Sequence, residues 1–119
     1  MPLPCPPFKP CPCGSGRSYA ACCQPAHSAQ QPPATPEQLM RSRYAAFFLQ
    51  DEAYLLGTWH PDTRPAQLHL NDGTRYTGLT IHQAQGAEVE FTVRMRLPNG
   101  RAHRFRERSR FVQLDERWL

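Results

Sequence analysis

The longest regular pattern in this chain occupies residues 88–111, which read EVEFTVRMRLPNGRAHRFRERSRF. Its first half alternates between apolar and polar residues, which is typical of a β-strand with one buried face. The apolar positions are Val89, Phe91, Val93, Met95 and Leu97. A turn at Pro98-Asn99-Gly100 follows, and a second strand is expected to return from about His103 to Leu114. The segment therefore predicts an antiparallel hairpin.

The cost of burying charge predicts the register of this hairpin. A two-residue loop would place Val93 opposite Arg106 and would mix apolar and charged residues on one face. A three-residue loop over residues 99–101 places Val93 opposite Glu107 instead. We therefore predict the three-residue loop, because it keeps the arginines out of the apolar face. The other face then collects Arg94, Arg96, Arg104, Arg106, Arg108 and Arg110.

These six arginines form a surface suited to an anionic partner. Guanidinium groups on one face fit phosphate backbones, such as those of ribosomal RNA, or an acidic protein. No aromatic residue interleaves with them, which argues against stacking on single-stranded bases. The alternative is a solvated sheet face whose charge prevents edge-to-edge aggregation.

Two helices are predicted upstream. Thr35 is a good N-cap, Pro36 occupies the first helical position, and Gln38 completes a capping-box pattern. Apolar residues then recur at helical spacing at Leu39, Met40, Tyr44, Phe47 and Phe48. Asp51 can cap a second, short helix that ends before Pro61. Period-two segments at residues 68–70 and 79–81 predict further strands, so the expected fold is α+β, with helices covering one face of an antiparallel sheet.

Composition divides the chain into two parts. Of its 13 prolines, ten fall within the first 36 residues, where long helices and central strands are excluded. We therefore assign residues 1–34 to a cysteine- and proline-rich head and linker, and residues 35–119 to the body. The net charge is +4, and no apolar run approaches the roughly 18–20 residues of a membrane span. The N-terminus has no basic and apolar leader, which predicts a cytoplasmic protein without a membrane partner.

The five cysteines all lie in this head, at Cys5, Cys11, Cys13, Cys22 and Cys23. The vicinal pair Cys22-Cys23 would form strained disulfides, and no export signal is visible. Two close pairs separated by eight residues fit four thiolates on one tetrahedral metal ion, which leaves Cys5 out. Such a site is structural and closed, and a 13-residue unit of this kind is expected to fold independently of the body. The alternative is a set of free or disulfide-linked thiols.

The cysteine segment resembles the SEC-C motif, which is best known from the SecA translocation motor. It reads Cys-Pro-Cys-Gly-Ser-Gly-x-x-Tyr-x-x-Cys-Cys over residues 11–23, with Cys23 where His is common. Residues 39–47, 54–61 and 106–111 resemble the YchJ family of small bacterial proteins. The resemblance implies a cone-shaped, NTF2-like body after a SEC-C knuckle. It also implies zinc, with iron as the alternative, and a protein or ribosomal partner for the knuckle.

An NTF2-like cone commonly encloses a pocket between the helices and the concave face of the sheet. Glu107 is expected there among apolar residues, where a buried carboxylate needs a partner. The candidate pocket residues are Arg43, Tyr44, Trp59, His60, Arg64 and Glu107. The alternative is a buried ion pair that only locks helix to sheet. The remaining histidines fall on polar faces and are expected to be solvated: His27, His69, His82 and His103.

Our first functional hypothesis is a non-enzymatic, metal-binding adaptor whose knuckle contacts a protein or the ribosome. The second is a small-molecule binding protein or enzyme that uses the cone pocket.

Overall fold

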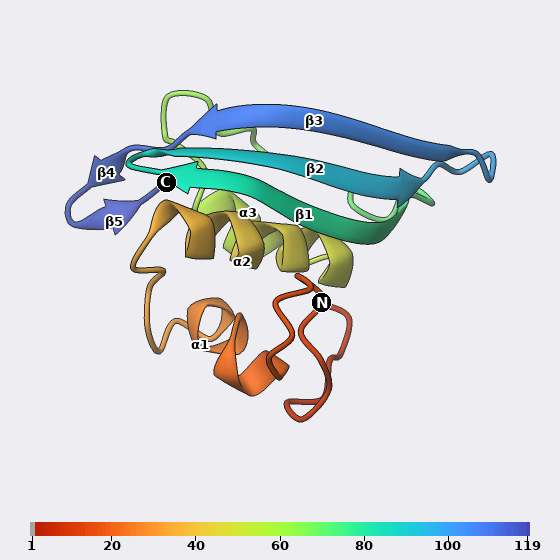
Figure 1. The fold of residues 1–119 in the computed structure, drawn as a ribbon, viewed down its shortest axis with the longest axis horizontal. Helices are drawn as coiled ribbons and strands as arrows, with labels where there is room; N and C mark the ends of the chain where they lie inside the picture. The colour runs from red at the N-terminus through yellow and green to blue at the C-terminus, as the bar shows by residue number, and fades with distance from the viewer. Residues whose placement is uncertain (1) are drawn as a thin grey trace.

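The computed structural model describes residues 2–119 and confirms the α+β class. An antiparallel sheet lies on one side, helices lie beneath it, and the cysteine-rich segment lies beneath the helices (Figure 1). The sheet has the strand order β1-β2-β3, and a small hairpin, β4-β5, stands beside it. The elements are η1 (Tyr19–Ala21), α1 (Gln24–His27), α2 (Pro36–Leu49), α3 (Glu52–Gly57), β1 (Arg75–Gln85), β2 (Glu88–Arg96), β3 (Ala102–Arg110), β4 (Gln113–Leu114) and β5 (Arg117–Trp118).

Helix α2 begins where the capping pattern predicts. The Thr35 hydroxyl accepts the Gln38 amide at 3.1 Å, and the Gln38 side chain accepts the amide of Ala34 at 2.9 Å. The helix ends at Leu49, because Gln50 takes a left-handed conformation with φ 58°. It packs against β1, β2, α3 and α1, so it forms the centre of the molecule.

The hairpin of β2 and β3 has a different register from the predicted one. Val93 pairs with Phe105 rather than with Glu107, and the Leu97 amide donates to the Arg101 carbonyl at 2.9 Å. The loop therefore has three residues as predicted, but they are residues 98–100. Gly100 supplies the left-handed conformation, with φ 85°, that closes such a loop. The shift of two residues leaves every side chain on its predicted face.

Two strand predictions were wrong. Residues 68–70 form no strand. The outer edge of β1 was free to accept a fourth strand, but this segment does not pair with it. The returning strand stops at Arg110 instead of continuing to Leu114. The Phe111 amide still donates to the Ala87 carbonyl, which continues the register of β2 and β3 by one residue. The chain then leaves the sheet, and Leu114 pairs with Arg117 in the small hairpin.

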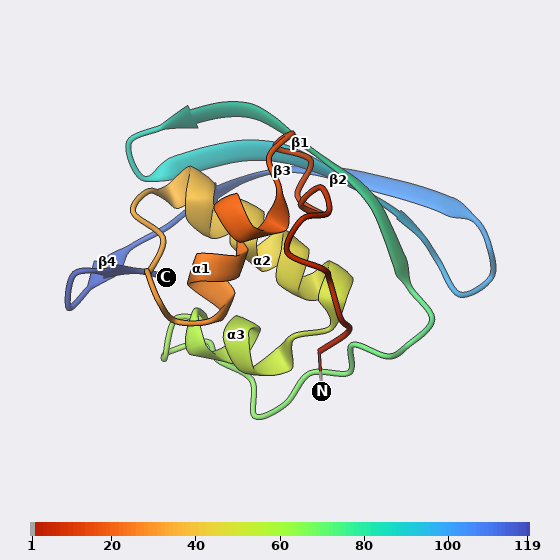
Figure 2. The same ribbon diagram turned by 90° about the horizontal axis from the view of Figure 1, so that it is seen from below.

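One hydrophobic core joins the cysteine-rich segment to the body. It contains Cys11, Cys13, Tyr19 and Cys23 together with residues of α2, β2 and the chain after β3. Figure 2 shows the segment and α1 lying against α2, on the side away from the sheet. Residues 24–34, expected to be a linker, include α1 and take part in this packing. Among the described residues, no helix has the length and apolar character that crossing a membrane requires.

Candidate metal centre

A tight loop brings the first two cysteines together. The Cys11 amide donates to the Arg17 carbonyl at 2.9 Å, and the Gly14 amide donates to the Cys11 carbonyl at 3.1 Å. The chain reverses direction between Cys11 and Arg17 because Gly14 and Gly16 adopt φ values of 78° and 88°. Residues with a side chain rarely adopt this left-handed conformation. Both sulfurs of the Cys11-x-Cys13 pair therefore lie on one side of the loop.

A short 3-10 helix presents the second pair. The Ser18 hydroxyl caps η1 by accepting the Ala21 amide at 3.3 Å. Tyr19 is buried within this turn and anchors it to the core. Cys22 and Cys23 follow directly after η1, so the turn directs them back toward the first pair.

The four sulfurs form one compact group. All of them lie within 4.8 Å of one another, with 3.5 Å between Cys13 and Cys22 and 3.8 Å between Cys22 and Cys23. A tetrahedral zinc site with Zn–S bonds of about 2.3 Å has sulfurs about 3.8 Å apart. Cys22 is half-buried and the other three are buried. No disulfide joins the described cysteines, and Cys5 lies outside the group.

The electrostatics of the group fit a cation. Hydrogen bonds from Cys11 and Cys23 hold the pKa of Cys13 far below its usual range. The same bonding raises the pKa of Cys11 to about 12, and bonding to Cys11 and Cys13 raises that of Cys23. The mutual hydrogen bonds thus favour the thiolate at Cys13 and disfavour it at Cys11 and Cys23. Four sulfurs this close can all ionise only around a positive ion, and thiolates favour a soft one.

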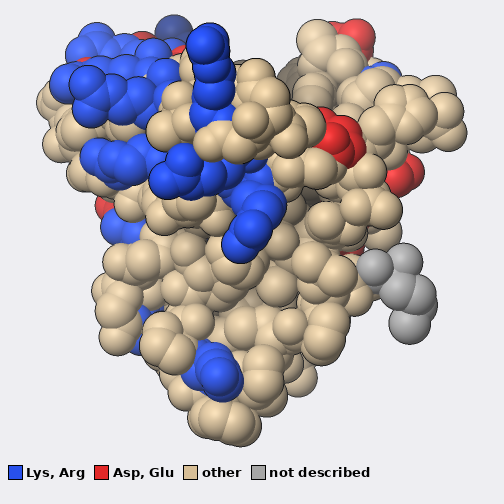
Figure 3. All heavy atoms as spheres, turned by 90° about the vertical axis from the view of Figure 1, so that its right-hand side faces the viewer, with Lys and Arg blue, Asp and Glu red and all other residues tan. Residues whose placement is uncertain are grey.

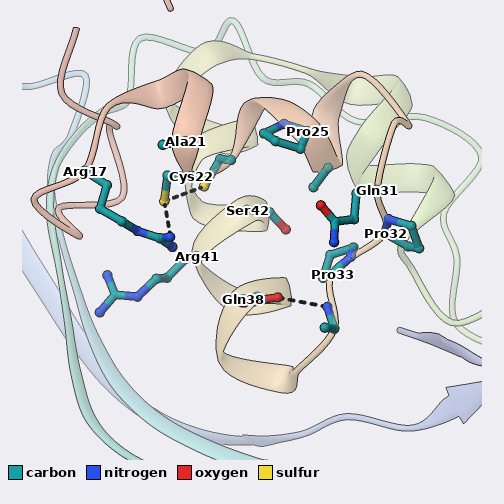
Figure 4. Close-up of a pocket in the computed structure, with 13 residues that line it drawn as sticks. Arg17, Ala21, Cys22, Pro25, Gln31, Pro32, Pro33, Gln38, Arg41 and Ser42 are labelled. Atoms are coloured by element: carbon teal, nitrogen blue, oxygen red, sulfur yellow. Dashed lines mark hydrogen bonds between the residues drawn. The ribbon is translucent and has the colours of Figure 1, made fainter. Parts of the chain in front are cut away.

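Two arginines that the sequence analysis missed lie beside the sulfurs. Arg41 of α2 donates to the Cys13 carbonyl at 3.1 Å, and its Nη1 lies 4.0 Å from the Cys13 sulfur. Arg17 approaches the Cys22 sulfur to 3.9 Å (Figure 4). Four thiolates and a divalent ion would carry a formal charge of two minus, which the two guanidinium groups offset in part, because Arg41 also binds the Glu37 carboxylate at 3.1 Å. Arg17 could have been found from its place inside the motif, whereas only the packing of α2 reveals Arg41.

A partly buried polar network connects this group of sulfurs to the body. The His27 Nε2–H donates to the Ser42 carbonyl at 2.8 Å, so its Nδ1 accepts the Tyr19 hydroxyl at 2.6 Å. The ring lies 4.7 Å from that of Tyr54, whose hydroxyl bonds Ser42 Oγ at 2.6 Å. Burial lowers the pKa of His27 and favours the neutral ring that this pattern needs. The expectation that His27 is solvated was therefore wrong.

The candidate pocket residues divide into two groups. Arg43 and Glu107 line a cavity of about 240 Å³ between α2 and the concave face of the sheet, together with Tyr44. Trp59, His60 and Arg64 are not among its lining residues. Trp59 stacks on Arg43, whose guanidinium carbon lies 5.0 Å from the centre of the indole ring.

The expected burial of Glu107 was wrong. Its side chain points to the predicted face but is exposed, and it accepts the Ser109 hydroxyl at 2.6 Å. None of the basic candidate pocket residues, Arg43, His60 and Arg64, forms an ion pair with it among the described residues. The reason is that β3 is an edge strand, so α2 covers it incompletely, and Phe105 is also 39% exposed.

Comparisons with known proteins match both parts of the chain. The SEC-C motif matches residues 9–25, and the family described as "YchJ, middle NTF2-like domain" matches residues 35–119. A UPF0225 protein of Deinococcus radiodurans is 68% identical over 114 residues, which cover 96% of this chain and 88% of that protein. One from Streptomyces coelicolor is 46% identical over 118 residues, covering 95% and 93%.

Two solved structures share the fold. The solution structure of a SEC-C motif containing protein from Rhodopseudomonas palustris is 34% identical, covers 91% of each chain and superimposes with a TM-score of 0.78. A crystal structure of a sec-c motif containing protein from Psychrobacter arcticus has a TM-score of 0.72 at 24% identity, with 94% and 80% coverage, and shows likeness of fold alone. The expected NTF2-like body behind a SEC-C segment is thereby confirmed.

Proposed function

The chain belongs to the YchJ family of UPF0225 proteins, and we propose that it is a non-enzymatic, metal-binding adaptor. In this proposal the SEC-C knuckle holds one Zn²⁺ through Cys11, Cys13, Cys22 and Cys23, in the reducing cytoplasm. The convergence of the four sulfurs within 4.8 Å carries the proposal. Because all four positions of a tetrahedral ion are taken by protein, the metal would serve structure and not catalysis.

An exposed aromatic residue supports a docking role for the knuckle. Phe8 is 80% exposed and lies in the loop whose Lys9 carbonyl accepts the Tyr19 amide at 2.8 Å. The metal centre would therefore fix the position of this side chain, as rigid presentation of an aromatic anchor requires. The resemblance to the SEC-C motif of SecA favours a protein or ribosomal partner.

Metal analysis tests the first part of the proposal. The protein purified under reducing conditions is expected to contain one zinc ion per chain, and Cys13→Ser and Cys22→Ser are expected to lose it. Cys5→Ser is the matched control and should keep full occupancy. Substitution with Co²⁺ checks the ligand set in the intact chain, because tetrahedral thiolate coordination has a characteristic absorption. A wild-type chain without that absorption would contradict the site, whereas iron in place of zinc would change only the metal.

Co-sedimentation with purified ribosomes tests the second part. Phe8→Ser is expected to weaken co-sedimentation, whereas Phe105→Ser, a change of the same kind on the sheet, should leave it unchanged. Equal retention of both variants would contradict docking through the knuckle.

One observation favours a second function, the binding of a small molecule in the concave cavity. The Nε of Arg43 is buried and has no hydrogen-bond partner among the described residues, although Arg43 lines this apolar cavity. A ligand with a carboxylate and an apolar body would supply the missing acceptor. Thermal stabilisation by medium-chain carboxylates that is lost in Arg43→Met would support this function, and no stabilisation would exclude that ligand class.

A further inference from the structure

Like charges oppose each other across the outer face of the sheet. Arg75 pairs with Arg96 between β1 and β2, and Arg94 pairs with Arg104 between β2 and β3. Like charges at directly opposite positions destabilise a sheet. We call these four residues the arginine cluster. It includes Arg75, which the sequence analysis did not place on this face.

Two arginines of the six-arginine face, Arg106 and Arg108, have an acidic partner, whereas the cluster has none among the described residues; Arg110 likewise forms no ion pair there. Arg106 and Arg108 both bind Glu90, with distances of 2.7 Å and 3.1 Å to its two carboxylate oxygens. Within residues 2–119, no member of the cluster forms an ion pair. Arg94 bonds the Thr80 hydroxyl and Arg96 bonds the Gly100 carbonyl, both neutral groups. The cluster therefore carries its full positive charge.

The cluster is exposed and surrounds a shallow hollow. All four side chains are exposed, and Arg94, Arg96 and Arg104 line the hollow with Thr77 and Ala102. Figure 3 shows basic residues gathered at this end of the molecule, over the sheet. Alternate residues of a strand lie about 7 Å apart and neighbouring strands about 5 Å apart. A nucleic-acid duplex carries one charge per about 1.7 Å of its axis, so several phosphates fit such an array.

The residues around the arginine cluster favour a nucleic acid over a protein as its partner. Protein interfaces usually centre on buried aromatic or apolar anchors. None of the exposed large apolar side chains belongs to this face: they are Leu3, Phe8, Phe48, Phe105, Val112 and Leu114. Nucleic-acid interfaces are polar and strongly positive, as this surface is. Among the described residues, no Phe, Tyr or Trp lies on this face for stacking on bases, so a duplex fits better than a single strand.

We infer that the arginine cluster binds the phosphate backbone of duplex nucleic acid without reading its base sequence. This surface is separate from the metal centre, which lies on the other side of α2 (Figure 1). The inference does not depend on the proposed function.

Fluorescence anisotropy with labelled duplexes tests this inference on the metal-loaded protein. The probes are two DNA duplexes of unrelated sequence and one RNA duplex, in 50–200 mM NaCl. Each phosphate contact contributes about 0.9 to the slope of log K against log salt. Three or four contacts predict that Kd rises about 40- to 150-fold over this range. The two DNA duplexes should bind with equal Kd, because the base sequence is not read. Comparison with the RNA duplex shows whether DNA or RNA is preferred.

Two double variants with the same change of net charge locate the site. Arg94→Gln with Arg104→Gln is expected to reduce the magnitude of the slope by about 1.8. Arg106→Gln with Arg108→Gln, which removes arginines already bound to Glu90, should leave the slope nearly unchanged. Circular dichroism checks that both variants are folded. Equal effects of the two variants, no salt-dependent binding by the wild type, or tighter binding of polyglutamate than of a duplex would each overturn the inference.

Discussion

The hydrogen bonds of His27 give a quantitative test of how the knuckle is joined to the body. His27→Phe keeps an aromatic ring against Tyr54 but removes the bonds to the Tyr19 hydroxyl and the Ser42 carbonyl. Tyr19 is only 7% exposed, so its unpaired hydroxyl costs about 1–3 kcal/mol. The bond to Ser42 is worth about 1 kcal/mol more. We therefore expect a loss of about 2–4 kcal/mol, a large part of the roughly 5–15 kcal/mol that stabilises a typical domain.

Urea unfolding of the zinc-loaded protein measures this loss. Trp59 and Trp118 both lie in the body, so their fluorescence reports whether a change at the knuckle is felt there. With a slope of about 2 kcal/mol per molar urea, the midpoint should fall by about 1–2 M. Tyr19→Phe combined with His27→Phe removes both partners of one bond and should recover part of the loss.

A change in unfolding free energy below about 0.5 kcal/mol for His27→Phe would refute the reasoning. So would a tryptophan transition that is unaffected by chelation of the metal. In that case the knuckle would unfold independently of the body, as the sequence analysis predicted.

Three further changes test the sheet. Arg104→Gln removes a like-charge pair across the strands and should raise the free energy of unfolding by about 0.2–1 kcal/mol, as measured by urea unfolding. Glu107→Gln should leave the melting temperature nearly unchanged, because the carboxylate is exposed; a clear loss would show a hidden ionic partner. The guanidinium of Arg108, with that of Arg106, lowers the pKa of Glu90, so this carboxylate stabilises the fold above the usual carboxyl pKa of about 4.5 and stops doing so as the pH falls below it. Glu90→Gln should therefore flatten the fall of the melting temperature between pH 5 and 3, and an unchanged acid profile would contradict this role.

Features that depend on neighbouring residues could be predicted from the sequence. The spacing of the cysteines with Gly14 and Gly16 predicts the group of four sulfurs, since the reversal occurs within 13 residues. Thr35 and Gln38 predict the start of α2, because a helix cap is formed by residues three apart. Alternation along β2 and β3 correctly predicts which side chains share a face.

The tertiary structure alone decided the features that depend on distant segments. One local feature also needed the structure: alternation has a period of two, so it does not distinguish two registers that differ by two residues, and the conformation of the loop, with Gly100 left-handed, selects between them. Likewise, alternation places Glu107 on the inner face, but its exposure depends on how far α2 covers an edge strand. Arg41 beside the sulfurs and Arg75 opposite Arg96 arise from contacts between segments far apart in the chain. Local patterns determined the grouping of the four cysteines and the strand faces, whereas packing determined which charges have ion-pair partners among the described residues.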